Sequence, residues 1–186
     1  VEGGTKDEKT IFYTGMYHLL IHPNILQDVN GEYPMMESLK VGHTTGNRYT
    51  VFSLWDTYRN VSTLMTLLYP ERQLDIIRTM LDMYRENGWL PKWELYGRET
   101  FTMEGDPSIP YIVDAWMRGL RDFDEQTAYE AMRKGATTPG EFNLLRPDAN
   151  DYFSKGYVPL REQYDNSVSH ALEYYCLLYT SPSPRD

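Results

Sequence analysis

The sequence has little of three things. It holds one cysteine in 186 residues, Cys176, which excludes a framework of disulfides. It has no apolar run of the roughly 20 residues that a membrane-spanning helix needs, so no such span is expected. Its 18 basic residues are outnumbered by 27 acidic ones, for a net charge of −9. Since binding to nucleic acid requires a basic surface, a nucleic-acid partner is not expected.

The cysteine lies in an unusual C-terminal segment, residues 176–186. Its sequence, CLLYTSPSPRD, resembles the in-frame translation of a transposase adapter used in sequencing libraries. Residues that come from processing or cloning are left out when a fold is inferred from sequence. We therefore expect the native domain to span residues 1–175, and residues 176–186 to be adapter-derived. The native part then has no cysteine and no thiol nucleophile.

Helical periodicity dominates the remainder. Apolar residues recur at three- and four-residue steps, and helix-start and helix-stop signals flank several of these runs. No segment alternates strictly between apolar and polar residues, so strands are expected to be minor. The pattern predicts an all-α domain, with helices in residues 10–21 and 50–68, from Pro70 to Asn87-Gly88, after Asp106-Pro107 as N-cap and first helical residue, after Asp124, and from Asn166 or Ser167.

Three long connections separate these helices: residues 23–49, 89–105 and 137–160. Each exceeds the usual connection of roughly 4–6 residues, and long loops in compact domains are usually functional. Helices joined by such loops predict a helical toroid with its long loops gathered over one mouth.

One polar group interrupts an apolar run. Trp55, Asp56 and Arg59 follow Leu54 directly. A charge in such a run is costly unless it is paired or used. Asp56 and Arg59 are three residues apart, so a helical ion pair is one interpretation. A binding site is the other, and the residue types alone leave both open.

A second group combines aromatic rings with carboxylates. Trp89 and Trp93 flank Pro91, and Glu94 and Glu99 follow. Aromatic faces stack on sugar rings and carboxylates accept hydrogen bonds from hydroxyl groups, so the group suits a carbohydrate site. A loop fixed by packed tryptophans is the structural alternative. On residue types alone, Glu94 or Glu99 would be the candidate catalytic acid.

Other chemistry is not indicated. The four histidines show no metal-ligand spacing, so no metal site is predicted within the chain. The stretch from Asp28 to Glu32 lacks the spacing of a calcium-binding EF-hand loop and reads as a turn. There is no phosphate-binding glycine loop and no nucleophile elbow.

Read together, the segments resemble glycoside hydrolase family 92, the calcium-dependent α-mannosidases of bacteria. The resemblance runs through most of the chain in the family's order. Its carriers are FYT–YH with HP (12–23), DVNGEY (28–33), YTVFSLWDTYR (49–59), GWLPKWE (88–94), residues 114–124 and SVS–LEY (167–174). The tryptophan-aspartate and proline-lysine-tryptophan-glutamate motifs are its more specific parts.

The resemblance implies a partial (α/α)6 barrel, preceded in the intact enzyme by a β-sandwich domain. It implies an exo-acting, inverting enzyme that removes mannose from the α-mannosides of N-glycans or mannan. It implies calcium as cofactor and a secreted, periplasmic or outer-surface bacterial location. The family's acid lies in a glutamate-glycine-asparagine motif and its base in an asparagine-aspartate-rich motif. Both lie downstream of this sequence, as do most calcium ligands.

No catalytic residue is therefore expected in this chain, which should be inactive alone. Asp56 matches the aspartate that holds hydroxyl groups of the terminal mannose. Trp55, Arg59, Trp93 and Glu94 are the expected neighbours at the barrel mouth. Many relatives carry histidine after a Met-x-Gly pattern where this chain has Asp106. Two other functions remain open: a different (α/α)6 carbohydrate-active enzyme that uses Glu94 or Glu99 as catalytic carboxylate, and a non-catalytic helical binding module.

Overall fold

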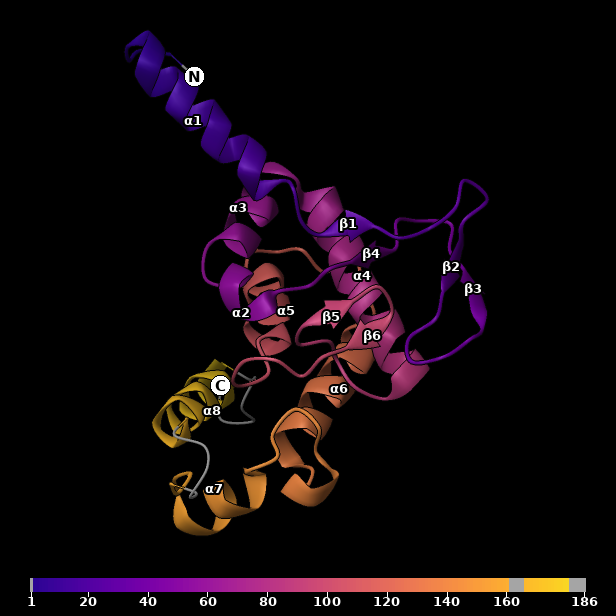
Figure 1. Cartoon of the computed structure of the whole chain (residues 1–186), viewed down its shortest axis with the longest axis vertical. Helices are drawn as coiled ribbons and strands as arrows, with labels where there is room; N and C mark the ends of the chain where they lie inside the picture. Colours follow the sequence, from indigo (N-terminus) through magenta and orange to yellow (C-terminus); the bar gives the residue numbers. More distant parts are fainter. Residues whose placement is uncertain (1, 161–165, 181–186) are drawn as a thin grey trace.

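The protein is built of helices with short β-hairpins between them (Figure 1). The computed structural model describes residues 2–160 and 166–180, with side chains up to residue 177. The helices are α1 (Lys6–Leu19), α2 (Leu54–Thr57), α3 (Val61–Leu68), α4 (Pro70–Asn87), α5 (Ser108–Met117), α6 (Glu125–Thr137), η1 (Gly140–Phe142, a 3-10 helix), α7 (Ala149–Lys155) and α8 (Ser167–Thr180). The predicted predominance of helix is confirmed.

Helix α4 forms the centre of the core. It packs against α3, α5 and α6, and Ile77 and Met80 on its inner face are 0% exposed. Full burial of one such side chain contributes about 1.5–3 kcal/mol. The sequence signals at both ends are confirmed. Pro70 opens the helix, and Gly88 closes it with φ +86°, where its N–H donates to the Tyr84 carbonyl.

The apolar run 50–68 is not one helix, which corrects the prediction. It begins in an extended strand and continues as two short helices, α2 and α3. The break falls after Tyr58, where Asn60 leaves the helical region and its side-chain oxygen accepts from the Val61 N–H. The asparagine provides a new helix start, and the resulting bend separates α2 from the body of α3.

Two other predicted boundaries hold. Asp124 caps α6 by accepting from the Thr127 N–H, and α8 begins at Ser167. Helix α8 continues through Cys176 to Thr180, into the segment predicted to be adapter-derived, and Leu177 there is 0% exposed. Residues 181–186 of that segment lie outside the described residues. The adapter origin stays a prediction.

The strands occupy two of the three long connections. They are β1 (Asn24–Ile25), β2 (Glu32–Pro34), β3 (Val41–His43), β4 (Tyr49–Thr50), β5 (Glu94–Leu95) and β6 (Arg98–Glu99). Strand β1 pairs with β4, β2 with β3 and β5 with β6, each antiparallel. The turn predicted at Asp28 to Glu32 is confirmed, because the Gly31 N–H donates to the Asp28 carbonyl. The third connection holds η1 and α7.

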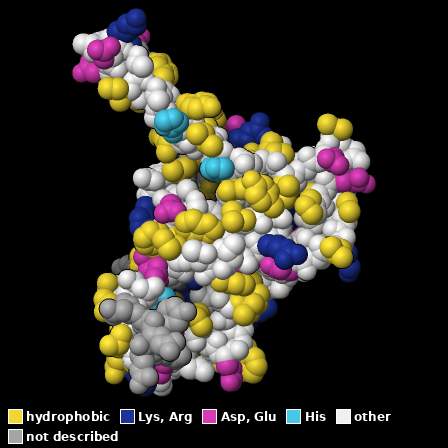
Figure 2. Space-filling model, viewed as in Figure 1, with side chains coloured by type: hydrophobic (Ala, Val, Ile, Leu, Met, Phe, Trp, Pro, Cys, Tyr) yellow, Lys and Arg dark blue, Asp and Glu magenta, His cyan; other side chains and the backbone are white. Residues whose placement is uncertain are grey.

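Helix α1 projects from the body (Figure 1) and buries none of its residues. A capping box starts it earlier than the apolar pattern predicts: Glu8 N–H donates to Thr5 Oγ1, and Glu8 Oε2 accepts from the Thr5 N–H. Figure 2 shows hydrophobic side chains along this helix, and Ile11 is 72% exposed. Among the described residues, none of the helices has the length and apolarity to cross a membrane.

Candidate functional site

The site begins where strand β4 leads into α2. Two backbone bonds fix this segment against the tryptophan loop: Phe52 N–H donates to the Glu94 carbonyl, and Leu54 N–H donates to the Lys92 carbonyl. Leu54 is buried at 1% exposure and anchors α2 in the core. The pairing brings together the two clusters singled out from the sequence, so that Trp93 lies beside the start of α2.

Asp56 stands on the exposed side of α2. Among residues 2–160 and 166–177, its carboxylate has no hydrogen bond and no ion pair. Arg59 instead pairs with Glu173 of α8, with Nη2 2.8 Å from Oε1. The helical ion pair between Asp56 and Arg59 is therefore wrong. The carboxylate of Asp56 is left available for a ligand.

Glu173 organises the side chains around Asp56. Its carboxylate accepts from the Trp55 indole N–H at 3.3 Å and from the Tyr58 hydroxyl at 3.5 Å. Burial raises the pKa of Tyr58 to about 12, with the negative charge of Glu173 adding to the effect, so Tyr58 stays a neutral donor. The guanidinium of Arg59 lies 4.8 Å from the Trp55 ring centroid and 4.4 Å from that of Tyr58.

Glu99 holds the tryptophan loop from within. Its carboxylate accepts three backbone N–H bonds, from Lys92 at 2.7 Å, Trp93 at 2.8 Å and Phe101 at 2.9 Å. Only 9% of Glu99 is exposed. The bonds leave Trp93 half-buried, with part of its surface open to solvent. Glu99 therefore shapes the loop that presents Trp93.

Glu94 has the same kind of role. It is 0% exposed, and its carboxylate accepts from Thr50 Oγ1 at 2.9 Å, Val51 N–H at 3.1 Å and Gly97 N–H at 2.5 Å. Burial raises the pKa of Glu94, while the bond from Gly97 opposes that shift. The sequence placed Glu94 at the barrel mouth. The structure places its carboxylate beneath the β5–β6 turn, which argues against both a direct substrate contact and a catalytic carboxylate.

Asp106 is not a side-chain helix cap, which corrects that prediction. Its carboxylate binds Arg146, with Oδ1 2.6 Å from Nη2 and 3.1 Å from Nε. Both residues are at most 2% exposed. Burial raises the pKa of Asp106 and lowers that of Lys92 nearby, and the opposite charges offset part of each shift. Asp106 thus ties the start of α5 to the loop before α7.

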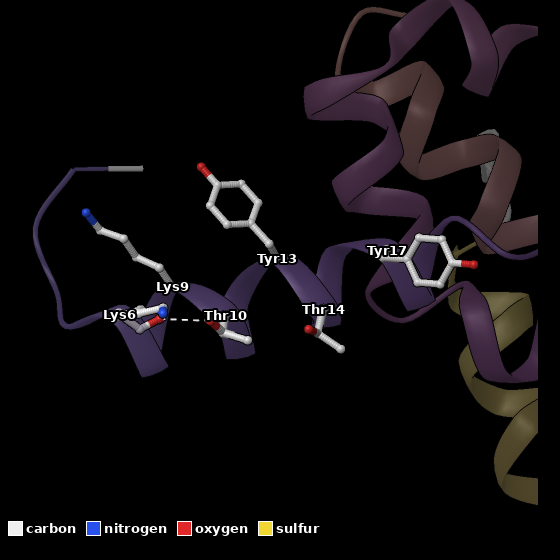
Figure 3. A pocket seen from close by; sticks show the side chains of 6 residues that line it. All are labelled: Lys6, Lys9, Thr10, Tyr13, Thr14 and Tyr17. Atoms are coloured by element: carbon white, nitrogen blue, oxygen red, sulfur yellow. Dashed lines mark hydrogen bonds between the residues drawn. The ribbon is translucent and has the colours of Figure 1, made fainter.

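Two hollows, of 680 and 560 Å³, contain none of the five predicted site residues. One, of 680 Å³, is lined by six residues of α1, and Figure 3 shows their side chains along that helix. The other, of 560 Å³, lies between residues 101–104, the loop before α7 and the start of α8. His170 lines it and its Nδ1 lies 2.8 Å from Asp148 Oδ2.

A bound metal ion needs several ligands that converge on one point. Within the described ranges, three or more His, Cys, Asp or Glu side chains nowhere converge on a point that a metal ion would occupy. Asp56 by itself offers two carboxylate oxygens, whereas Ca²⁺ takes 6–8 oxygen ligands. The described His, Cys, Asp and Glu side chains therefore do not make up a complete calcium site.

Sequence reasoning missed Glu173 as a site residue. It lies 114 residues after Arg59, and nothing in its local spacing marks it. The only signal was its place in the LEY stretch that the family resemblance includes.

Comparison with known proteins supports the geometry. The model of the glycosyl hydrolase family 92 catalytic domain matches residues 1–179. An α-mannosidase of that family from Bacteroides thetaiotaomicron is 34% identical over 97% of this chain, with a TM-score of 0.87. The same mannosidase with bound mannoimidazole gives a TM-score of 0.82 at 35% identity over 93% of the chain.

Two further relatives agree. A family 92 inverting mannosidase from the same bacterium is 28% identical over 99% of the chain, with a TM-score of 0.78. A protein of Arthroderma benhamiae described as an uncharacterized secreted glycosidase is 27% identical over 94% of the chain. The chain covers 24%, 28% and 20% of the first mannosidase, the second mannosidase and the fungal protein.

The long helices, the Trp55–Asp56 segment and the tryptophan loop thus define part of a helical glycoside hydrolase domain. This chain belongs to glycosyl hydrolase family 92. The match reaches residue 179, four residues past the predicted native boundary at residue 175.

Proposed function

We propose that the chain forms part of an exo-acting, inverting α-mannosidase, and that Asp56 binds hydroxyl groups of the terminal mannose. One observation carries the proposal: Asp56 is exposed beside the half-buried Trp55 and has no partner among the described residues, while Arg59 is bound to Glu173. A carboxylate accepts hydrogen bonds with two oxygens, and bonds to an ionised group are the stronger kind. The mannosidases at 34% and 28% identity support mannose as the sugar.

The other predicted site residues have different roles in this proposal. Trp55 and Trp93 are both half-buried, and we propose that the open part of their rings stacks on the apolar face of a sugar. Arg59, 44% exposed, lines the same region. Glu94 contributes from beneath by holding the turn that follows Trp93, without touching the substrate.

The reaction requires two further groups, which we propose lie outside this chain. Inversion uses a carboxylic acid that protonates the leaving oxygen and a carboxylate that activates water, about 6.5–9.5 Å apart. We place both in sequence beyond this chain, together with the ligands of a calcium ion that would bind sugar hydroxyls. The proposal extends to an N-terminal β-sandwich domain, to N-glycan or mannan α-mannosides as substrates, and to export from a bacterial cell. The fungal relative described as secreted is in line with export.

The test uses an extended enzyme, defined as a polypeptide in which residues 1–175 are continued by native sequence to the full length of the family's domains. We expect it to hydrolyse an aryl α-mannoside, whereas the 186-residue chain alone does not. Asp56→Asn should lower kcat/KM of the extended enzyme roughly 10- to 150-fold, because about 1.5–3 kcal/mol of charged hydrogen bonding is lost. Asp82→Asn, a change in an exposed ion pair, serves as control and should leave kcat/KM unchanged.

The outcomes are distinct. An inactive extended enzyme with a cooperative thermal transition would favour the binding-module interpretation. An active enzyme in which Asp56→Asn equals wild type would remove Asp56 from the site while leaving the family activity in place. Turnover by the 186-residue chain would contradict the absence of acid and base.

Metal removal gives a second prediction. EDTA should abolish turnover by the extended enzyme, and added Ca²⁺ should restore it, because the ion would hold substrate hydroxyl groups. The thermal midpoint of the 186-residue chain should not shift with EDTA, since its described residues contain no cluster of three ligating side chains. Calorimetry on both polypeptides checks this. Retained turnover after exhaustive chelation would refute the calcium proposal.

A further inference from the structure

Helix α8 contributes one carboxylate to the proposed sugar site. Glu173 accepts from three donors in and directly after α2: Trp55 Nε1, Tyr58 Oη and Arg59 Nη2. Its side chain is 15% exposed, against 44% for Arg59. A carboxylate at this depth keeps a well-defined geometry, because three bonds from one short stretch restrain it.

The position of Glu173 depends on close packing of α8 against the 101–105 loop. A Cβ atom on Gly105 would lie 2.5 Å from Leu177 Cδ1 and 3.1 Å from Glu173 Cβ, and the residue has φ +71°. Only glycine meets both conditions without strain. Helix α8 also packs on α5, and His170 ties it to Asp148 before α7.

Glu173 decides which acid Arg59 neutralises. Arg59 is three residues from Asp56, a spacing at which helical side chains meet. In the structure its guanidinium lies between the Trp55 and Tyr58 rings and pairs with Glu173. Without the Glu173 charge, Asp56 is the nearest acid in sequence for Arg59 to pair with. That pairing would occupy the oxygens that the substrate needs.

We propose that Glu173 is a positioning residue for sugar binding: its carboxylate fixes the Trp55 indole and holds Arg59 away from Asp56. The inference rests on the proposed function of Asp56. It assigns to α8, more than a hundred residues downstream, control over the hydroxyl-binding carboxylate of α2. Glu173 touches no substrate in this role and takes no part in proton transfer.

The experiment measures KM and kcat of the extended enzyme, with mannoimidazole inhibition as a binding readout. Glu173→Ala should raise KM and the inhibition constant about tenfold, with kcat changed less than about threefold. Glu173→Gln should give a KM between those of wild type and Glu173→Ala. Its amide oxygen still accepts from Trp55 but carries no charge for Arg59. Asp148→Asn is the matched control: it loosens another anchor of α8 and should leave KM unchanged.

A rescue variant isolates the effect on Arg59. In Arg59→Met/Glu173→Ala no cation remains to capture Asp56, so KM should recover part of the loss seen in Glu173→Ala alone. No recovery would overturn the control of Arg59. Equal changes in Glu173→Ala and Asp148→Asn, or a fall in thermal midpoint with KM unchanged, would reduce Glu173 to a structural residue and overturn the proposal.

Failure of the two proposals is distinguishable. If Asp56→Asn raises KM and Glu173→Ala does not, the positioning role alone fails. If Asp56→Asn leaves KM unchanged, the sugar-binding role of Asp56 fails, and the positioning role falls with it.

Discussion

Arg146→Met is expected to lower the free energy of unfolding by about 3–5 kcal/mol, the usual cost of leaving one charge of a buried pair without its partner. Asp106 and Arg146 are at most 2% exposed and share two hydrogen bonds. Removing the guanidinium strands the Asp106 carboxylate where burial already raises its pKa. The contact also joins the start of α5 to the loop before α7, so both segments should loosen.

Urea denaturation followed by circular dichroism measures this loss. Arg118→Met is the matched control: Arg118 pairs with Asp114 at 2.9 Å on the surface of α5, at 50% and 31% exposure. An exposed pair of this kind contributes about 0–1 kcal/mol. A cost for Arg146→Met no larger than that of Arg118→Met would contradict the structural importance of the buried pair.

The second large effect concerns Glu99. Glu99→Ala leaves the N–H groups of Lys92, Trp93 and Phe101 without their acceptor. Each unsatisfied buried donor costs about 1–3 kcal/mol. Because Trp93 and Phe101 are only half-buried, water replaces part of the loss, and we expect a total of about 3 kcal/mol. Glu141→Ala, at an exposed site, should have little effect.

Changes at Glu99 and Glu94 also test whether either carboxylate is catalytic or structural. If Glu94 or Glu99 were the catalytic carboxylate of a different (α/α)6 enzyme, its change to glutamine would abolish turnover and retain both stability and mannoimidazole binding. The structure predicts the reverse order: Glu94→Gln and Glu99→Gln lower the unfolding midpoint of the extended enzyme, and residual folded enzyme keeps measurable kcat. Stability and turnover measured on the same preparations decide between them.

Signals within one helical turn were sufficient to predict several elements. Pro70 and Gly88 bound α4, and Asp124 caps α6, because each cap depends on backbone groups within one helical turn. The same local reasoning failed at Asp106, which has the sequence context of a cap but binds Arg146 instead. It also failed for the 50–68 run, whose apolar pattern continues across the break at Asn60.

The candidate site, too, was predictable from the sequence in part only. Family motifs in the sequence singled out Asp56 and its neighbours as candidates, and the helical fold class follows from the periodicity. Whether Asp56 is free depended on Arg59, and a pair three residues apart contributes only about 0.2–0.5 kcal/mol on an isolated helix. Such a preference is easily overridden by a tertiary partner. Glu173 overrides it from a point 114 residues further along the chain.

By itself, therefore, the sequence determined the helical fold class, several helix ends, the family and the segment that carries Asp56. Only the tertiary structure decided that Arg59 belongs to Glu173, that Asp106 belongs to Arg146, and that Glu94 and Glu99 serve backbone donors. The physical reason is that helix signals act between adjacent residues, whereas a buried charge pairs with whichever opposite charge or donor the packing brings within about 3 Å.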